Sequence, residues 1–187
     1  MRYKVTQGPS AEPLSVSEVK DYLKVDTSAD DTLIGTLITA AREWVERHCS
    51  LALLPQTVLQ VWDGLNDNMQ LAVSPIRSVS AITYRDTSGT EQTLSASVYD
   101  VDSISTPARI NRAYGQTWPA GHTTTDAASA VFTAGYDAAS AVPASIKTAM
   151  LLTIADMYDN RTDYVKRLPT AAEYILQSAG HRVWLFQ

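Results

Sequence analysis

The chain has 187 residues, a formal net charge of −5 at pH 7, 45% hydrophobic residues and 19% charged residues. This length suits one ordinary domain, and this balance of residues excludes disorder along most of the chain. The 15 lysines and arginines are scattered along the sequence. The composition therefore argues against binding of nucleic acid through a basic surface.

The chain has one cysteine, Cys49, which excludes an internal disulfide and implies no oxidising compartment. We interpret Cys49 as a small apolar residue near a helix end. The longest uncharged apolar run of the predicted helices, residues 148–155, is far shorter than the roughly 20 residues of a membrane span. The N-terminus also lacks the apolar core of a signal peptide. We therefore expect no membrane contact and a cytoplasm-like environment.

The first predicted helix begins after Ser15, which is a good N-cap residue. Glu18 stands three residues later and completes a capping box. Leu14 and Val19 occupy the two positions of a hydrophobic staple, which packs the residue before the cap against the helix. These local signals predict a helix with a defined start.

A second, longer helix follows, with Ser28 and Asp31 as its predicted capping pair. Apolar residues recur along it at helical spacing, so it should bury one broad face. Arg42 is expected to lie off that face. The predicted buried stripe consists of Leu33, Leu37, Ile38, Ala41, Trp44, Val45 and His48.

Between residues 56 and 135 the pattern changes to the alternation of β-strands. The runs QTVLQVW, NMQLAV, SVSAITY, ARINR and SAVFTAG all have strand composition, and so does a run from Gln92 to Leu94 that leads on to Val98, Tyr99 and Val101. Residues 86–89 have the composition of a hairpin turn. Residues 118–129 are expected to form a loop. We count roughly six strands, which is enough for a small antiparallel sheet or sandwich.

The helical pattern returns at Pro143, a residue that suits the first turn of a helix. Apolar residues then occur on nearly every side as far as Met157, which is typical of a central helix. A last helix is predicted from Thr170, with Glu173 as its capping-box partner and Gly180 as its stop.

This order of elements predicts an α+β fold. An antiparallel helical core forms from the N- and C-terminal helices, residues 14–50 and 143–179, and an antiparallel β-sheet or small sandwich, residues 56–135, is inserted between them. We expect a single domain over residues 1–187, with residues 180–187 as a C-terminal extension.

The sequence contains no recognisable catalytic or cofactor motif. The three histidines lack metal-binding spacing, and neither a phosphate-binding glycine pattern nor a nucleophile elbow occurs. We therefore predict no enzymatic activity, no cofactor and no metal. The alternative is a small metal-dependent hydrolase that uses Asp156, Asp159 and Asp163 near a helix end, although these carboxylates also suit the solvated end of a buried helix.

Two segments have the composition of interaction surfaces. The first is the polar helix end, where we name Tyr158, Asp159, Arg161 and Tyr164 as candidates for subunit contacts, because Tyr and Arg are enriched in protein interfaces. An ordinary surface loop is the alternative there.

The second segment is the C-terminal tail, Arg182, Val183, Trp184, Leu185 and Phe186. Its apolar side chains are costly to leave in water, so they should meet a partner or pack back on their own subunit. Their alternation suits the addition of a strand to a partner's sheet.

The ordered series of motifs resembles the head–tail connector (adaptor) proteins of long-tailed double-stranded DNA phages. The resemblance rests on PLSVSEVKDYLKVD, LIGTLITAAREWVERHCSLALLPQT, SPIRSVSAITYRDTSGTEQTL, YDVD, VFTAGY and VPASIKTAMLLTIADMYDNR. It covers nearly the whole chain, and the order and spacing of the motifs carry it more than any one of them.

This resemblance implies a structural protein of the virion neck, assembled in the host cytoplasm. Such proteins form a ring, commonly of twelve copies, under the portal protein, and DNA passes through the ring without sequence-specific binding. They dock the next neck (stopper) or tail protein. The C-terminal segment commonly reaches the portal, which makes residues 182–186 the portal-binding candidates here. The alternative is a tail-completion or tail-terminator ring that binds the tail tube.

Overall fold

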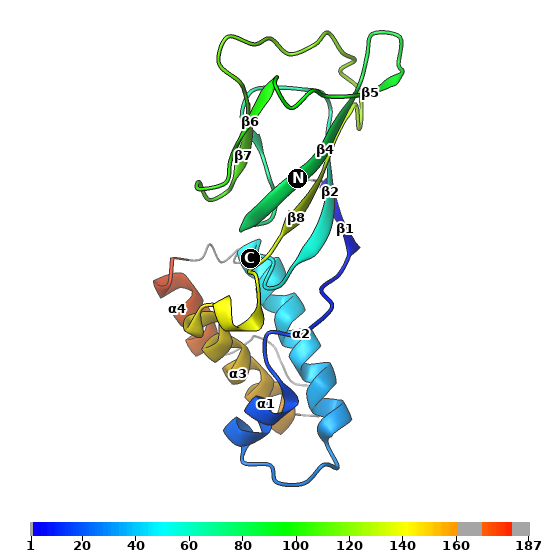
Figure 1. Ribbon diagram of the computed structural model, residues 1–187. Helices are drawn as coiled ribbons and strands as arrows, with labels where there is room; N and C mark the ends of the chain where they lie inside the picture. The colour runs from blue at the N-terminus through cyan, green and yellow to red at the C-terminus, as the bar shows by residue number, and fades with distance from the viewer. Residues whose placement is uncertain (1, 161–169, 181–187) are drawn as a thin grey trace. The chain divides into compact units, whose positions relative to one another are not determined.

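The computed structural model of the protein describes residues 2–160 and 170–180. The chain forms two compact units, and each is described by itself (Figure 1). One unit is built from Ser10–Leu54 and Tyr136–Gln187, and the other from Met1–Pro9 and Pro55–Gly135. The first is helical and the second consists of antiparallel sheets, which confirms the predicted α+β fold.

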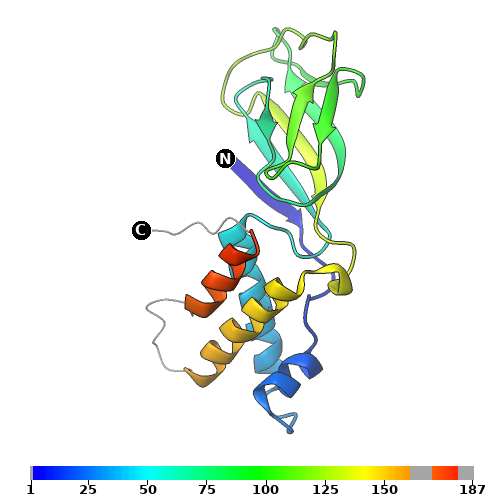
Figure 2. The ribbon, with the colours of Figure 1, turned by 90° about the vertical axis from the view of Figure 1, so that its left-hand side faces the viewer.

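The helical unit brings the N-terminal and C-terminal helices of the chain into one core, as predicted. Figure 2 shows its longer helices packed along one another. The fully buried Ile34, Val45, Ile146, Met150 and Leu176 belong to this core. Its helices are α1 (Val16–Leu23), α2 (Asp31–Cys49), the short 3₁₀ helix η1 (Ala139–Ala141), α3 (Ala144–Asp159) and α4 (Thr170–Ser178).

The start of α1 follows its sequence signal closely. The backbone N–H of Glu18 donates to the Ser15 hydroxyl at 3.1 Å, and the Glu18 carboxylate accepts from the Ser15 N–H at 2.7 Å. Leu14 and Val19, the two residues of the predicted staple, are both buried. The capping-box and staple predictions are therefore confirmed.

The start of α2 differs from the prediction. Its N-cap is Asp30, not Ser28, and Ser28 takes part through its backbone carbonyl, which accepts from the Asp31 N–H at 3.3 Å. A serine and an acidic residue three positions apart are a frequent combination, so this signal does not by itself fix a helix start.

The buried face of α2 is turned slightly from the predicted stripe. Leu33 and Leu37 are only partly buried, whereas Ile34 is fully buried. Arg42, expected off the stripe, lies within the buried face. The buried residues of α2 are Ile34, Ile38, Ala41, Arg42, Val45 and Cys49.

The other unit contains two antiparallel sheets. The five-stranded sheet has the order β1-β2-β8-β4-β5, and the three-stranded sheet has the order β3-β7-β6. The strands are β1 (Arg2–Gln7), β2 (Gln56–Trp62), β3 (Met69–Gln70), β4 (Ile76–Arg85), β5 (Glu91–Thr93), β6 (Tyr99–Asp102), β7 (Arg109–Arg112) and β8 (Ala128–Ala134).

Three features of these sheets differ from the prediction. The strand β1 was not predicted: all six of its residues are exposed at a sheet edge, so its sequence carries no alternation of buried and exposed residues. The run beginning at Met69 supplies only a two-residue strand. Seven strands, not roughly six, lie between residues 56 and 135.

The five-stranded sheet has one buried face and one open face. Side chains alternate along β2, with Val58 and Gln60 buried and Leu59 and Val61 partly exposed. The Gln60 side chain, 1% exposed, donates to the carbonyl of Gln70 at 2.8 Å and accepts from the N–H of Ala72 at 2.8 Å. The buried face is therefore the one directed toward the three-stranded sheet.

Candidate interaction surfaces

Tyr158 anchors the end of α3 to the start of α2 within the helical unit. Its hydroxyl donates to the Asp30 carboxylate at 2.5 Å, and its ring packs against the helical core. Asp30 is the N-cap residue of α2, where a negative charge is favourable. One function of this tyrosine is thus internal to the subunit, and its contact with a neighbouring subunit stays a prediction.

The other predicted contact residues are only partly described. Asp159 is the last residue of α3 and is exposed, as a contact residue must be. Arg161, Tyr164 and the tail, residues 182–186, lie outside the described residues. The assignments of these residues to subunit and portal contacts stay predictions.

The carboxylates considered for a metal site have other surroundings. The Asp156 carboxylate accepts a hydrogen bond from the side chain of Asn160 at 3.0 Å. Within residues 2–160 and 170–180, no group of three His, Cys, Asp or Glu side chains is placed to hold a metal ion. Asp163 lies outside this part of the chain.

Cys49, the last residue of α2, has the surroundings of a structural cysteine. Burial raises the pKa of its thiol to about 11, so the thiol stays protonated at neutral pH. Because the thiolate is the nucleophilic form, this cysteine is unreactive. The interpretation of Cys49 as a small apolar residue near a helix end is confirmed.

A buried ionic cluster around Arg42 was missed by sequence reasoning. Its guanidinium bonds the Glu12 and Glu46 carboxylates at 2.8 Å each, and Glu46 also accepts from the Leu53 N–H at 2.9 Å. Burial raises the pKa of Glu46, although the hydrogen bond from Leu53 and the charge of Arg42 lower it. The cluster ties the segments before α1 and after α2 to the α2 helix. The i, i+4 spacing of Arg42 and Glu46 was its only sequence signal.

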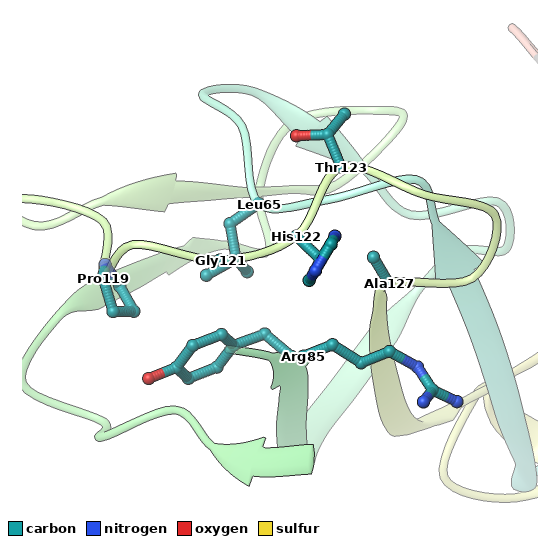
Figure 3. A pocket seen from close by; sticks show the side chains of 8 residues that line it. Leu65, Arg85, Pro119, Gly121, His122, Thr123 and Ala127 are labelled. Atoms are coloured by element: carbon teal, nitrogen blue, oxygen red, sulfur yellow. The ribbon is translucent and has the colours of Figure 1, made fainter. Parts of the chain in front are cut away.

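A small pocket lies where the loop after β7 returns to the end of β4 (Figure 3). Its volume is about 160 Å³. Figure 3 shows the His122 ring pointing from the loop toward the strand that carries Arg85. Its lining residues are Leu65, Tyr84, Arg85, Pro119, Gly121, His122, Thr123 and Ala127.

The backbone around this pocket explains why it exists. The His122 N–H donates to the Arg85 carbonyl at 2.9 Å, and Gly121 pairs with Asp86 in an isolated bridge. A Cβ at Gly121 would lie only 2.9 Å from the Arg85 carbonyl oxygen, so the loop needs glycine for this approach. Backbone contacts of Gly121 and His122 thus hold the loop after β7 against the end of β4, and the pocket is the space beside this contact.

Two further features lie at the surface of the same unit. Ile104, in the turn between β6 and β7, is 95% exposed. On the open face of the five-stranded sheet, a groove of about 180 Å³ has Leu59 and Val61 among its lining residues. Neither was found from the sequence, since a single isoleucine among serines forms no pattern and a groove depends on tertiary structure.

Comparison with known protein families shows which family the chain belongs to. The model of the phage gp6-like head–tail connector proteins matches residues 13–114, which is more than half of the chain. The chain belongs to the phage gp6-like head–tail connector family. Membership confirms the resemblance described above. It also supports a structural protein and confirms the prediction that the protein is not an enzyme.

The fold of this connector protein is also found in solved structures of gene transfer agent (GTA) particles. A chain from the virion of a native GTA particle matches with a TM-score of 0.79 and 22% identity, covering 100% of this chain and 98% of that one. A chain from the neck of an empty GTA particle, computed with C6 symmetry, gives 0.78 and 21% with the same coverage. A chain from the neck of a native particle, computed with C12 symmetry, gives 0.70 and 22%, again with that coverage. Among curated proteins, no match was found.

No helix among the described residues combines the length and the apolar character needed to cross a membrane.

Proposed function

We propose that this connector protein is a structural component of the virion neck that forms a ring under the portal, extends the DNA channel and docks the next neck or tail component. The family match carries the proposal. The likeness in fold over the whole chain to chains from GTA necks supports it, because those necks were computed with C6 and C12 symmetry. In this proposal the helical unit and the β unit act together as one connector.

The charge of the chain suits a channel through which DNA moves. Each phosphate that a protein neutralises adds to its affinity for DNA, so a dense basic lining would hold the DNA tightly. The chain has 20 acidic and 15 basic residues and a net charge of −5. This composition supports passage of DNA without sequence-specific binding.

A closed ring requires head-to-tail contacts, in which each copy presents two different surfaces. We propose that the polar end of α3, with Tyr158, Asp159, Arg161 and Tyr164, contributes to one of them. We further propose that the tail, residues 182–186, binds the portal, since four of its five side chains are apolar or aromatic.

Deletion of residues 182–187 tests the portal contact. The shortened protein should keep its circular dichroism spectrum and thermal unfolding but fail to attach to portal-bearing heads. Attachment at the wild-type level would remove the tail from the proposal. Pull-down of the full chain against purified portal and tail-tube proteins tests the ring's location, and binding to the tube alone would indicate a tail-completion or tail-terminator protein instead.

A further inference from the structure

Three segments of the chain connect the helical unit to the β unit. The first connecting segment, residues 8–15, lies between β1 and α1, and the second, residues 50–55, lies between α2 and β2. Each of these two segments makes hydrogen bonds to the Arg42 cluster or contributes a residue to it. The Arg42 cluster consists of Glu12, Arg42 and Glu46.

The first connecting segment is attached to α2 mainly through one side chain. Within the part of the chain that the structure describes, residues 9–14 make no hydrogen bond between backbone groups. The Glu12 carboxylate accepts from the Thr39 hydroxyl at 2.9 Å and from Arg42 Nε at 2.8 Å, so both of its oxygens are occupied. Leu14 adds an apolar contact, since it is buried. The Glu12 carboxylate is therefore the polar attachment of this segment.

Glu46 accepts hydrogen bonds from three N–H groups of the second connecting segment. Its backbone carbonyl accepts from Ser50 and, at 3.0 Å, from Leu51, and its carboxylate accepts from the Leu53 N–H at 2.9 Å. The other oxygen of this carboxylate accepts from Arg42 Nη1 at 2.8 Å. The Glu46 side chain is only 11% exposed, so removal of its cation would leave a buried charge unpaired.

One guanidinium joins these two attachments. Arg42 is 7% exposed, and its Nε and Nη1 atoms donate to different carboxylates, those of Glu12 and Glu46. A guanidinium holds its N–H donors in a rigid plane, so the direction of one bond fixes the direction of the other. Loss of this group would remove a hydrogen bond from Glu12 and the paired charge from Glu46 at the same time.

We propose that Arg42 is a positioning residue that clamps the first and second connecting segments to α2, so that both segments loosen together when the guanidinium is lost. The clamp fixes where two of the three connecting segments leave the helical unit. It does not depend on the proposed ring, because all of its residues belong to the helical unit of one copy.

Nuclear magnetic resonance of the purified full chain tests the clamp at both segments. Arg42→Met should raise the exchange rate of the Leu53 amide at least about tenfold, because this N–H loses its positioned acceptor. It should also lower the heteronuclear NOE of the Ala11 amide, because the first segment gains motion on the picosecond-to-nanosecond timescale. Arg47→Met, at an exposed position of the same helix, is the control and should change neither value.

Two conservative variants distinguish the clamp from a general loss of stability. Glu12→Gln keeps the shape of the side chain but removes its charge, so it should free Ala11 and leave the Leu53 exchange rate within about twofold of wild type. Arg42→Lys should have the same effect, because a single ammonium group lacks the planar fork and keeps only the i, i+4 partner Glu46.

Three results would overturn the clamp. An unchanged Leu53 amide or an unchanged Ala11 NOE in Arg42→Met would show that the guanidinium does not hold both segments. An equal rise in exchange at Leu53 and at Ile154, which is fully buried on α3, would indicate global unfolding in place of local release. If Arg42→Met does not fold, Arg42→Lys decides, since wild-type values at both segments in that variant would exclude a role of the planar fork.

Discussion

The Tyr158 hydroxyl donates a hydrogen bond to the carboxylate of Asp30, residues that are 128 positions apart in the sequence. This bond joins the C-terminal end of α3 to the N-cap of α2. The dense polar sequence after the apolar part of α3 therefore begins with a residue that holds two helices of the core together.

Removal of the Tyr158 hydroxyl should weaken the helical unit. Because the acceptor is a carboxylate in a partly buried position, Tyr158→Phe should lower the free energy of unfolding by about 1–2 kcal/mol. Urea denaturation measures the change. The control is Tyr174→Phe on α4, whose side chain is 71% exposed and whose hydroxyl loss should cost nothing measurable. Equal effects of the two substitutions would show that the bond to Asp30 does not stabilise the fold.

Loss of the buried guanidinium of Arg42 should lower the free energy of unfolding more than loss of the Tyr158 hydroxyl does. Arg42→Met keeps much of the side-chain volume but leaves the Glu46 carboxylate buried without its cation, which should cost roughly 3 kcal/mol. The matched control is Arg47→Met, an exposed position on the same helix, where the change should stay within about 0.5 kcal/mol. An Arg42→Met protein as stable as wild type at pH 7 would contradict a stabilising role of the cluster.

The sequence predicted the helical unit better than the sheets. The reason is how far apart in the sequence the interacting residues stand. The capping box of Ser15 and Glu18 acts within one turn, so both partners appear together in the sequence. The burial of Arg42 depends on Glu12, thirty positions away, and a helical wheel of α2 alone does not show it. Similarly, the alternation of the run QTVLQVW predicts a strand but does not show that Gln60 is buried between the two sheets.

The contacts assigned to the candidate sites stay predictions, whereas the α+β fold is confirmed. Local composition selected the polar end of α3, and Tyr158 proved to bond within its own subunit. The exposure of Ile104 and the groove on the five-stranded sheet were not predicted, because both follow from tertiary structure. The strand β1 was not predicted, because an edge strand exposed on both faces needs no alternation of apolar and polar residues.

Gln60 should be essential for the attachment of β3 to the five-stranded sheet. Gln60→Leu removes both partners of the Gln70 carbonyl and the Ala72 N–H, and the free energy of unfolding should fall by roughly 2–4 kcal/mol. Hydrogen exchange should show faster exchange of the Ala72 amide. Gln116→Leu, at an exposed position of the same unit, is the control. An unchanged Ala72 exchange rate in Gln60→Leu would mean that another group protects this amide.

The Asp86 carboxylate in the hairpin turn after β4 should have a lowered pKa and contribute to stability in a pH-dependent way. Hydrogen bonds from the side chains of Ser88 and Gln92, with the Ser88 and Thr90 N–H groups, lower the pKa of Asp86 from 3.8 to about 2. A lowered pKa means that the carboxylate stabilises the folded state above pH 3.8 and that this contribution disappears as the pH falls through about 2. Ser88→Ala should therefore raise the pKa of Asp86 toward 3.8, as measured by carboxyl NMR titration. Thr87→Ala in the same turn should not change it, and an unmoved pKa in Ser88→Ala would assign the shift to other donors.

We propose that this protein forms a ring in the virion neck. Electron microscopy of the neck of intact particles tests it most directly, with the full chain fitted as separate helical and β units. We expect a ring of copies between the portal and the next neck or tail component, with the C-terminal segment of each copy at the portal. Density for the protein only at the end of the tail tube, or none in the neck, would contradict it.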